Sequence, residues 1–300
     1  MNGQHPAPRG IALWIAGARP RTLPAAVVPV MVGAACAAQG EGQAWWRVSL
    51  ALVVSLALQV GVNYANDYSD GIRGTDADRV GPLRLVGSGL VSAPKVKRAA
   101  FTAFAVAGAS GLVLASVTTW WLVVVGAAAM VAAWTYTGGP RPYGYAGFGE
   151  LFVFVFFGVV ATVGSQFVVA EKVTSTGWWA SVVTGCYACA MLVVNNLRDI
   201  PGDTVAGKNT LAVRIGDANT RRFLGLLVVV ALGAIIVTSF TAGVWAMAGL
   251  VGVVSTRPAL DAVARGAKGR DLIPVLGAVG RAQLILAVSY SAGLVAALVR

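Results

Sequence analysis

Charged residues are scarce in this chain, at 12% of its 300 residues, whereas soluble domains carry about 25%. Only three cysteines are present, too few for a disulfide framework. Together with a hydrophobic content of 57%, these values exclude a soluble enzyme, a disordered chain and a secreted disulfide scaffold. Glycine, in contrast, is abundant at 37 residues and is commoner in membrane helices than in soluble ones. The composition therefore predicts a protein that crosses a membrane several times.

Basic residues outnumber acidic ones and give a formal net charge of +11. They lie between long apolar runs rather than on one continuous polar face, so the excess does not predict a nucleic-acid-binding surface. We expect membrane lipid, and no nucleic acid, among the partners of this chain.

Nine charge-poor runs approach the roughly 20 residues that a helix needs to cross the hydrocarbon core of a bilayer. They are Leu23–Ala38, Val48–Ala65, Ala99–Val117, Trp120–Tyr136, Leu151–Ala170, Gly177–Val194, Phe223–Ser239, Thr241–Thr256 and Leu272–Val299. The stretch Phe223–Thr256 has two interpretations, one tilted helix or two short helices that turn near Ser239–Gly243. The distribution of charge favours two helices.

Lysine and arginine gather on one side of the membrane when nine spans are counted. The N-terminus and every second loop carry nineteen of them, and the opposite side carries only Arg47, Lys172 and Arg300. Cytoplasmic loops carry the excess of basic residues. We therefore predict an all-α, multi-pass transmembrane bundle of about nine spans, with the N-terminus in the cytoplasm and the C-terminus outside.

The few acidic residues form two similar motifs at cytoplasmic ends of apolar runs. Each motif has an asparagine four residues before an aspartate, and a further aspartate three or four residues later. The two sets are Asn63, Asp67 and Asp70, and Asn195, Asp199 and Asp203. These spacings place each set on one face of a helix. The duplication predicts one membrane-embedded domain whose two halves, approximately residues 11–140 and 150–300, meet at a shared site.

Carboxylates brought together repel one another unless a cation binds them. Oxygen ligands flanked by arginine and lysine suit Mg²⁺ that is held jointly with a phosphate substrate. A soft-metal site is excluded, because the only histidine is His5 in the N-terminal tail. The alternative is that the acids solvate loops and pair with arginines. The duplication and the position at the membrane edge favour a metal site.

Basic residues beside the motifs are candidates for binding a diphosphate, which arginine grips with two parallel hydrogen bonds. The candidates are Arg73, Arg84, Arg141, Arg198 and Lys208. For each of them the alternative is the general excess of basic residues on the cytoplasmic side. The Gly- and Pro-rich segment around Arg141 is not helical throughout, and irregular backbone at this depth is tolerated where it lines a cavity.

Two polar residues, Arg281 and Gln283, fall within the last apolar run. Because a charge inside the membrane is costly, they indicate either a cavity or a polar partner. The equal alternative is that the span begins late and leaves Arg281 at the interface.

Several segments together resemble the UbiA superfamily of intramembrane aromatic prenyltransferases, and within it the branch that prenylates 1,4-dihydroxy-2-naphthoate in menaquinone synthesis. The resemblance runs nearly from end to end of the chain. The matching segments are Ala18–Pro24, Asn63–Gly74, Arg79–Arg84, Ser88–Gly89, Asn195–Asp199, Gly207–Gly216 and Leu272–Pro274. One departure is Gly71, which stands where the fullest form of the first motif has its second aspartate, the third ligand of that motif.

The resemblance implies a polyprenyl diphosphate whose tail runs into a lateral opening among the helices. Two Mg²⁺ ions would bridge the diphosphate to the two motifs, with Arg73 and Lys208 among the catalytic residues. An allylic cation is then attacked by the ring carbon of the naphthoate, with loss of CO₂ and diphosphate, to give demethylmenaquinone. The resemblance also implies a location in the cell membrane with the active site facing the cytoplasm.

Two other functions remain as alternatives. The chain is either a prenyltransferase for another aromatic acceptor or, in a different class, a transporter of an anionic metabolite. Transporters place their charges near the middle of the membrane, whereas the motifs here lie at one face. A structural subunit of a respiratory complex would explain the apolar runs but not the duplicated acids.

Overall fold

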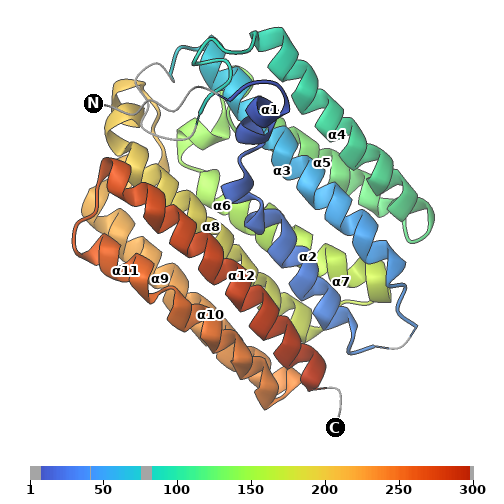
Figure 1. Ribbon diagram of the computed structural model, residues 1–300. Helices are drawn as coiled ribbons and strands as arrows, with labels where there is room; N and C mark the ends of the chain where they lie inside the picture. Colours follow the sequence, from blue (N-terminus) through green and yellow to red (C-terminus); the bar gives the residue numbers. More distant parts are fainter. Residues whose placement is uncertain (1–7, 41, 76–82, 298–300) are drawn as a thin grey trace.

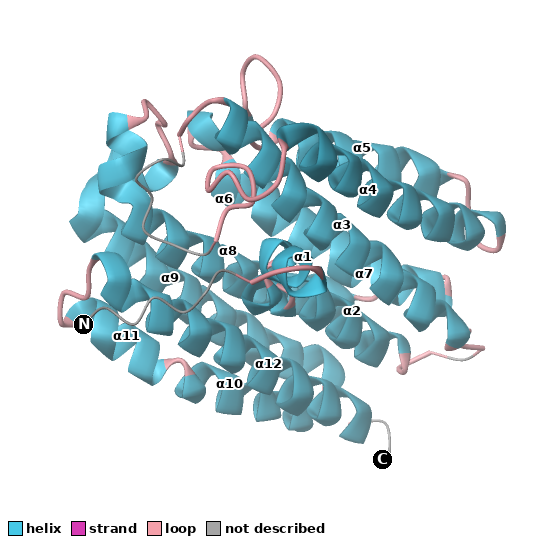
Figure 2. Cartoon of the chain, turned by 45° about the horizontal axis from the view of Figure 1, so that its top comes forward, coloured by secondary structure: helices cyan, strands magenta, loops and turns pink. Residues whose placement is uncertain are grey.

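The computed structural model describes residues 8–40, 42–75 and 83–297, and helices are the only regular elements within these ranges (Figure 2). The α-helices are α1 (Ile11–Ala18), α2 (Pro24–Ala37), α3 (Trp46–Ile72), α4 (Ala93–Ser116), α5 (Trp121–Thr135), α6 (Gly149–Val153), α7 (Ala161–Ala170), α8 (Ser175–Val205), α9 (Leu211–Ala242), α10 (Leu250–Ser255), α11 (Arg257–Ala264) and α12 (Leu272–Ala296). The short elements are η1 (Pro20–Thr22), η2 (Tyr143–Ala146), η4 (Val244–Gly249) and η5 (Gly269–Asp271), which are 3-10 turns, and the π-helix η3 (Phe154–Val160). Asp76, Asp78, Arg79 and Arg300 lie outside the described residues.

Seven of the described helices or helix runs are long and apolar enough to cross a membrane. An eighth is formed if α1 with η1 and α2 are counted as one span bent by 54°, and α5 is an apolar helix of 15 residues. The chain is therefore a multi-pass membrane protein, and the all-helical prediction is confirmed. The count of nine spans and the orientation stay predictions.

The ambiguous stretch Phe223–Thr256 is divided into two helical segments. Helix α9 ends at Ala242, and the next residue, Gly243, has φ 97°. Only glycine adopts such a conformation at little cost. The chain therefore turns within the predicted segment, and η4 and α10 run back along α12.

The helices form two groups around a central set (Figure 1). Helices α3, α4 and α5 pack together on one side, and α8, α9 and α12 on the other, with α2 and α7 between them. The largest buried core is built by α2, α8, α9 and α12 around Tyr187, Leu286 and Tyr290. Helix α5 packs less closely against the other helices, because Ala132 is its only buried residue.

Exposed tryptophans mark one end of the bundle. They lie at the starts of α3, α5 and α8 and just after α9, and are Trp45, Trp46, Trp120, Trp121, Trp178, Trp179 and Trp245. Tryptophan is enriched at membrane–water interfaces, so this end lies at one surface of the bilayer. Helices α3 and α8, with 27 and 31 residues, run from this end to the opposite one. Their lengths of about 40 Å and 46 Å exceed the hydrocarbon thickness and carry both polar motifs to the same far end.

Candidate functional site

A cavity of about 870 Å³ opens at the end of the bundle that carries the polar motifs. Its polar part is lined by Asn63, Asn66, Asp70, Arg84, Tyr145, Asn195, Asn196, Arg198, Asp199, Asp203 and Lys208. Its apolar part runs along α4, α5 and α7. The wall that α5 contributes begins at Leu122 and ends at Ala133, so the apolar part follows nearly the whole helix. The cavity thus joins a charged mouth to a long apolar slot.

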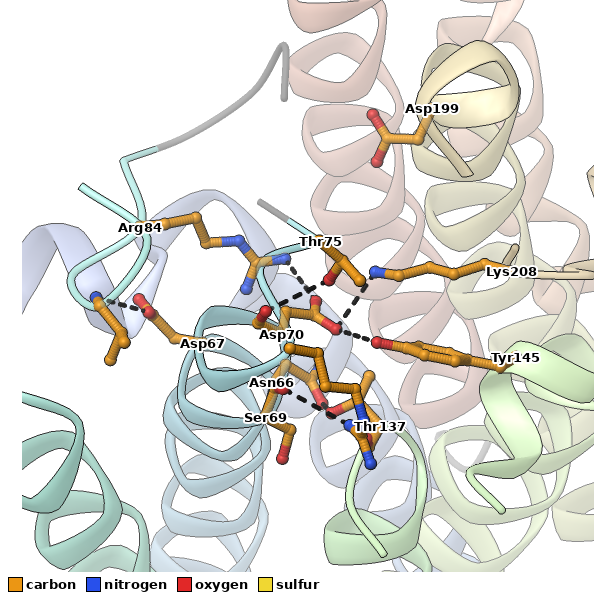
Figure 3. Close-up of polar contacts among 12 residues, drawn as sticks. Asn66, Asp67, Ser69, Asp70, Thr75, Arg84, Thr137, Tyr145, Asp199 and Lys208 are labelled. Carbon is orange, nitrogen blue, oxygen red and sulfur yellow. Dashed lines mark hydrogen bonds and ion pairs between the residues drawn. The ribbon is translucent and has the colours of Figure 1, made fainter. Parts of the chain in front are cut away.

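Asp70 is the centre of the charged mouth (Figure 3). Its carboxylate pairs with Arg84 (Nη2–Oδ2, 3.2 Å) and Lys208 (Nζ–Oδ1, 3.1 Å). The hydroxyl of Tyr145 donates to Oδ1 at 2.5 Å. Four segments far apart in the sequence therefore meet at one buried carboxylate.

Tyr145 holds two of these groups in place. Lys208 Nζ lies 4.7 Å from the centre of the Tyr145 ring, a cation–π contact. Burial, and then the charge of Asp70, raise the pKa of Tyr145 above its ordinary value. The hydroxyl therefore stays protonated at neutral pH and remains a donor to Asp70.

Asp67 points away from the cavity, toward the loop that follows residue 82 (Figure 3). Its carboxylate accepts hydrogen bonds from the backbone N–H groups of Leu85 (2.7 Å) and Val86 (2.9 Å). This contact holds the loop that delivers Arg84 to Asp70. Asp67 thus acts on the site through the backbone of that loop.

Asn66, rather than Asn63, stands one helical turn before Asp70 on the cavity face. Its Oδ1 accepts a hydrogen bond from Thr137 Oγ1 at 2.8 Å. Asn63 also reaches the cavity wall, but its Nδ2 donates to the Ala18 carbonyl oxygen (2.9 Å) and to Thr22 Oγ1 (3.1 Å). The sequence reasoning missed Asn66, although its spacing of i, i+4 to Asp70 is the same signal that selected Asn63 and Asp67.

All three residues of the second motif, Asn195, Asp199 and Asp203, line the cavity. Asp199 is gripped by its neighbour Arg198 through two hydrogen bonds, Nε–Oδ1 at 2.7 Å and Nη2–Oδ2 at 2.8 Å. The backbone oxygen of Asp203 accepts from the N–H of Lys208 at 2.8 Å. This turn reverses the chain after α8 and directs Lys208 back to Asp70.

The sequence reasoning also missed the pair that Asn196 forms with Glu150. Asn196 Nδ2 donates to Glu150 Oε1 at 2.9 Å, and both residues are buried. The pair ties the start of α6 to α8 at the cavity wall. Only the unusual position of an acid at the start of an apolar run signalled Glu150 in the sequence.

Arg73 and Arg141 do not line the cavity. The guanidinium of Arg73 donates to the backbone oxygens of Thr137 and Gly139 and lies 5.6 Å from the Tyr145 ring centre. Arg73 therefore braces the segment that carries Thr137 and Tyr145. Arg141 is exposed on the same segment. A role of either arginine in diphosphate binding stays a prediction.

The last helix contributes little to the polar site. Arg281 is exposed and is not part of the cavity lining. Gln283 is fully buried, and neither of its amide atoms has a hydrogen-bond partner in the described part of the chain. Both residues lie apart from the charged mouth.

The donor set of the mouth consists of carboxylate and amide oxygens, which hard cations such as Mg²⁺ prefer. Within residues 8–40, 42–75 and 83–297, no three His, Cys, Asp or Glu side chains are grouped closely enough to hold a metal ion by themselves. Such a mouth suits a cation that shares its ligands with phosphate oxygens, and Mg²⁺ is commonly bound in this way. Arg84, Arg198 and Lys208 supply positive charge for the same anion.

The fold and the site together define a membrane-embedded helical protein that binds an amphiphile with an anionic head and a long apolar tail. Comparison with known proteins gives the family. The chain belongs to the UbiA prenyltransferase family, whose model matches residues 26–271. The expected family is therefore confirmed.

Two relatives and one solved structure illustrate the similarity. The chain is 51% identical over 284 residues to 1,4-dihydroxy-2-naphthoate octaprenyltransferase of Mycobacterium tuberculosis, covering 94% of this chain and 97% of that protein. It is 38% identical to the Escherichia coli enzyme of the same name, covering 73% and 75%. A UbiA homologue from Archaeoglobus fulgidus bound to GPP and Mg²⁺ shares the fold, with a TM-score of 0.65, 13% identity and coverage of 96% and 99%.

Proposed function

We propose that this protein transfers a polyprenyl group from polyprenyl diphosphate to 1,4-dihydroxy-2-naphthoate, with loss of CO₂ and diphosphate, and so forms the quinol, the reduced form of demethylmenaquinone. One observation carries the proposal: Arg84, Lys208 and Tyr145 converge on Asp70 at the mouth of a cavity whose apolar part follows α5. A diphosphate head and a polyprenyl tail have matching chemistry. The relatives whose names carry this activity extend over most of the chain and support the acceptor.

Mg²⁺ fits the oxygen donors of the mouth. We place its protein ligands at Asn66, Asp70, Asn195, Asp199 and Asp203, all of which line the cavity. Asn63 and Asp67 were the expected partners of Asp70, but their polar atoms hold backbone and side-chain groups of α1, η1 and the 83–86 loop. Two ions, one for each motif, agree with the duplication. When bound, Mg²⁺ supplies charge that stabilises the departing diphosphate.

The reaction breaks the allylic C–O bond, and diphosphate keeps the electron pair. Arg84, Arg198 and Lys208 offset the charge that develops on the leaving group. The naphthoate ring carbon then bonds to the allylic carbon, and the carboxylate leaves as CO₂ and returns its electron pair to the ring. The apolar walls along α5 and α7 exclude water that would otherwise capture the cation.

The mouth faces the cytoplasm of a cell membrane in this proposal. The end of the bundle that carries the motifs has most of the lysine and arginine residues, and the opposite end carries the exposed tryptophans. Basic residues favour the cytoplasmic side. Soluble substrates and diphosphate then enter and leave on that side.

The test supplies purified protein in detergent with labelled geranylgeranyl diphosphate and 1,4-dihydroxy-2-naphthoate, and follows the lipid product. We expect product with Mg²⁺, no product with EDTA, and a loss of about 100-fold in rate for Lys208→Gln. Lys172→Gln, an exposed lysine at the opposite end, is the control and is expected to keep the wild-type rate. Product with another aromatic acceptor alone would change the substrate assignment, and no product with any acceptor would favour the transporter.

A further inference from the structure

Arg19 has an unusual backbone conformation at the break between α1 and α2. Its φ and ψ are 55° and 69°, in the left-handed region. A non-glycine residue there is uncommon, and glycine and asparagine fit the conformation better than arginine does. Since the backbone conformation does not favour arginine at this position, the reason for an arginine here lies in its side chain.

The guanidinium of Arg19 lines the cavity, and two of its nitrogens are not used by any of the described residues. Its Nε and Nη2 atoms are buried and have no hydrogen-bond partner among the described residues. Buried charged donors are costly unless an acceptor reaches them. The cations of the charged mouth differ, because Arg84 and Lys208 pair with Asp70 and Arg198 pairs with Asp199.

The backbone around Arg19 is held firmly by α3. Thr22 Oγ1 donates to the Arg19 carbonyl oxygen at 2.9 Å, and Gln59 Nε2 donates to Thr22 Oγ1 at 3.2 Å. Asn63 fixes the preceding carbonyl, that of Ala18, at 2.9 Å. The position of Arg19 is therefore built into the fold rather than left to a loop.

The part of α3 that holds the backbone around Arg19 lies apart from Asp70. Asn63 and Gln59 precede Asp70 by 7 and 11 residues on the same helix, which corresponds to about 10 Å and 16 Å along the axis. Nε and Nη2 of Arg19 bond to none of the described residues, so they are available to a second anion in the same cavity. The apolar side chains of Ala25, Met191 and Leu276 line the cavity as well, and they come from α2, α8 and α12.

We infer that Arg19 binds the carboxylate of the aromatic acid acceptor and so orients its ring toward the allylic carbon; this inference rests on the proposed function. A guanidinium matches a carboxylate with two parallel hydrogen bonds. The two anions of the reaction are then bound by separate cations, the diphosphate by Arg84, Arg198 and Lys208 and the carboxylate by Arg19. Arg19 acts as a positioning residue, since the bond-forming carbon lies on the ring.

The experiment measures equilibrium binding of 1-hydroxy-2-naphthoate and of 1-naphthol, which lacks the carboxylate, to the full chain in detergent without prenyl diphosphate. We expect the wild type to bind the acid about 10- to 100-fold more tightly than the naphthol, the usual effect of a hydrogen bond to a charged group. Arg19→Asn should abolish this difference and leave naphthol binding unchanged. Asparagine adopts the left-handed conformation readily, so we expect the variant to fold as well as the wild type, which its melting temperature checks.

Two controls separate the carboxylate site from other effects. Arg9→Asn removes an exposed arginine on the same side of the membrane and is expected to bind both ligands like the wild type. Binding of geranylgeranyl diphosphate to Arg19→Asn should stay within twofold of the wild-type value. Weakened diphosphate binding with unchanged acid binding would overturn the inference and assign Arg19 to the diphosphate.

Failure of the inference and failure of the proposed function give different results. A wild type that binds the acid no better than the naphthol overturns the inference, whether or not prenyl transfer occurs. Arg19-dependent binding of the acid without any prenylated product supports the carboxylate site and contradicts the proposed reaction.

Discussion

Lys208 and Asp70 form a buried ion pair, with 3.1 Å between Nζ and Oδ1, although 138 positions separate them in the sequence. The pair joins the chain after α8 to the end of α3. Because each of these helices carries one of the two polar motifs, the pair also joins the two predicted halves of the site. The arrangement concentrates charge at one end of a cavity that is otherwise apolar.

Replacing Asp70 with asparagine removes the carboxylate that Arg84 and Lys208 share. We expect prenyl transfer to fall about 100- to 1000-fold, because a cation ligand is lost and two cations become unbalanced. The rate of product formation at saturating Mg²⁺ measures the effect. Asp261→Asn is the matched control, since Asp261 is half-exposed on α11 and pairs only loosely with Arg257 at 3.7 Å. Equal activity of the two variants would contradict the central place of Asp70.

Asp67→Asn tests the distinction between the two neighbouring aspartates. The Asp67 carboxylate accepts hydrogen bonds from two backbone N–H groups, one on each oxygen. Asparagine has a single side-chain oxygen and therefore keeps only part of this bonding. We expect a loss of about 1–3 kcal/mol in stability, the cost of an unsatisfied buried group, which a lower melting temperature reports. The Mg²⁺ concentration for half-maximal rate should stay close to the wild-type value, whereas Asp70→Asn should raise it. A large rise for Asp67→Asn would restore Asp67 as a ligand.

The helical fold could be predicted from the sequence because its signals are local. An apolar run is recognised from neighbouring residues, and the distribution of lysine and arginine is read along the chain without any tertiary contact. The choice of the α3 residues that form the site could not be predicted, since both Asn63 and Asn66 stand at i, i+4 before an aspartate. What decides between them is tertiary: the 83–86 loop approaches Asp67, and η1 approaches Asn63. The role of Tyr145 was equally out of reach, because no local pattern links η2 to Asp70.

The pH dependence of stability should reveal that the Tyr145 hydroxyl is buried beside Asp70 and stays protonated. Burial and the charge of Asp70 raise the pKa of Tyr145 above its ordinary value of 10.0. A group whose pKa is raised on folding stabilises the protein fully below its unfolded pKa and loses this effect as pH rises through the folded pKa. The advantage of the wild type over Tyr145→Phe should therefore be constant from pH 7 to about 9 and shrink above about 10. Melting temperatures of both proteins across this range measure the advantage. If the advantage were the same at pH 11 as at pH 7, the buried and protonated state of the Tyr145 hydroxyl would be contradicted.

The apolar slot predicts where the length of the prenyl tail is limited. Gly164 lies on the cavity wall, and a Cβ atom added there meets no atom within 4 Å. Gly164→Leu therefore directs an apolar side chain into the space of the tail. We expect transfer from a long polyprenyl diphosphate to fall about tenfold, with little change for geranyl diphosphate, whose tail ends sooner. A single methylene misplaced in an apolar pocket already changes specificity by about tenfold.

Gly233→Leu is the matched control for this change. Gly233 is exposed on α9, is not part of the cavity lining, and also has open space at its Cβ position. The same substitution there adds apolar surface without entering the slot, so both donors should react at the wild-type rate. Rates for geranyl and octaprenyl diphosphates in the three proteins give the comparison. If Gly164→Leu left the rate with octaprenyl diphosphate unchanged, the tail would have to follow a path that does not pass α7, and the slot along α5 and α7 would lose its role.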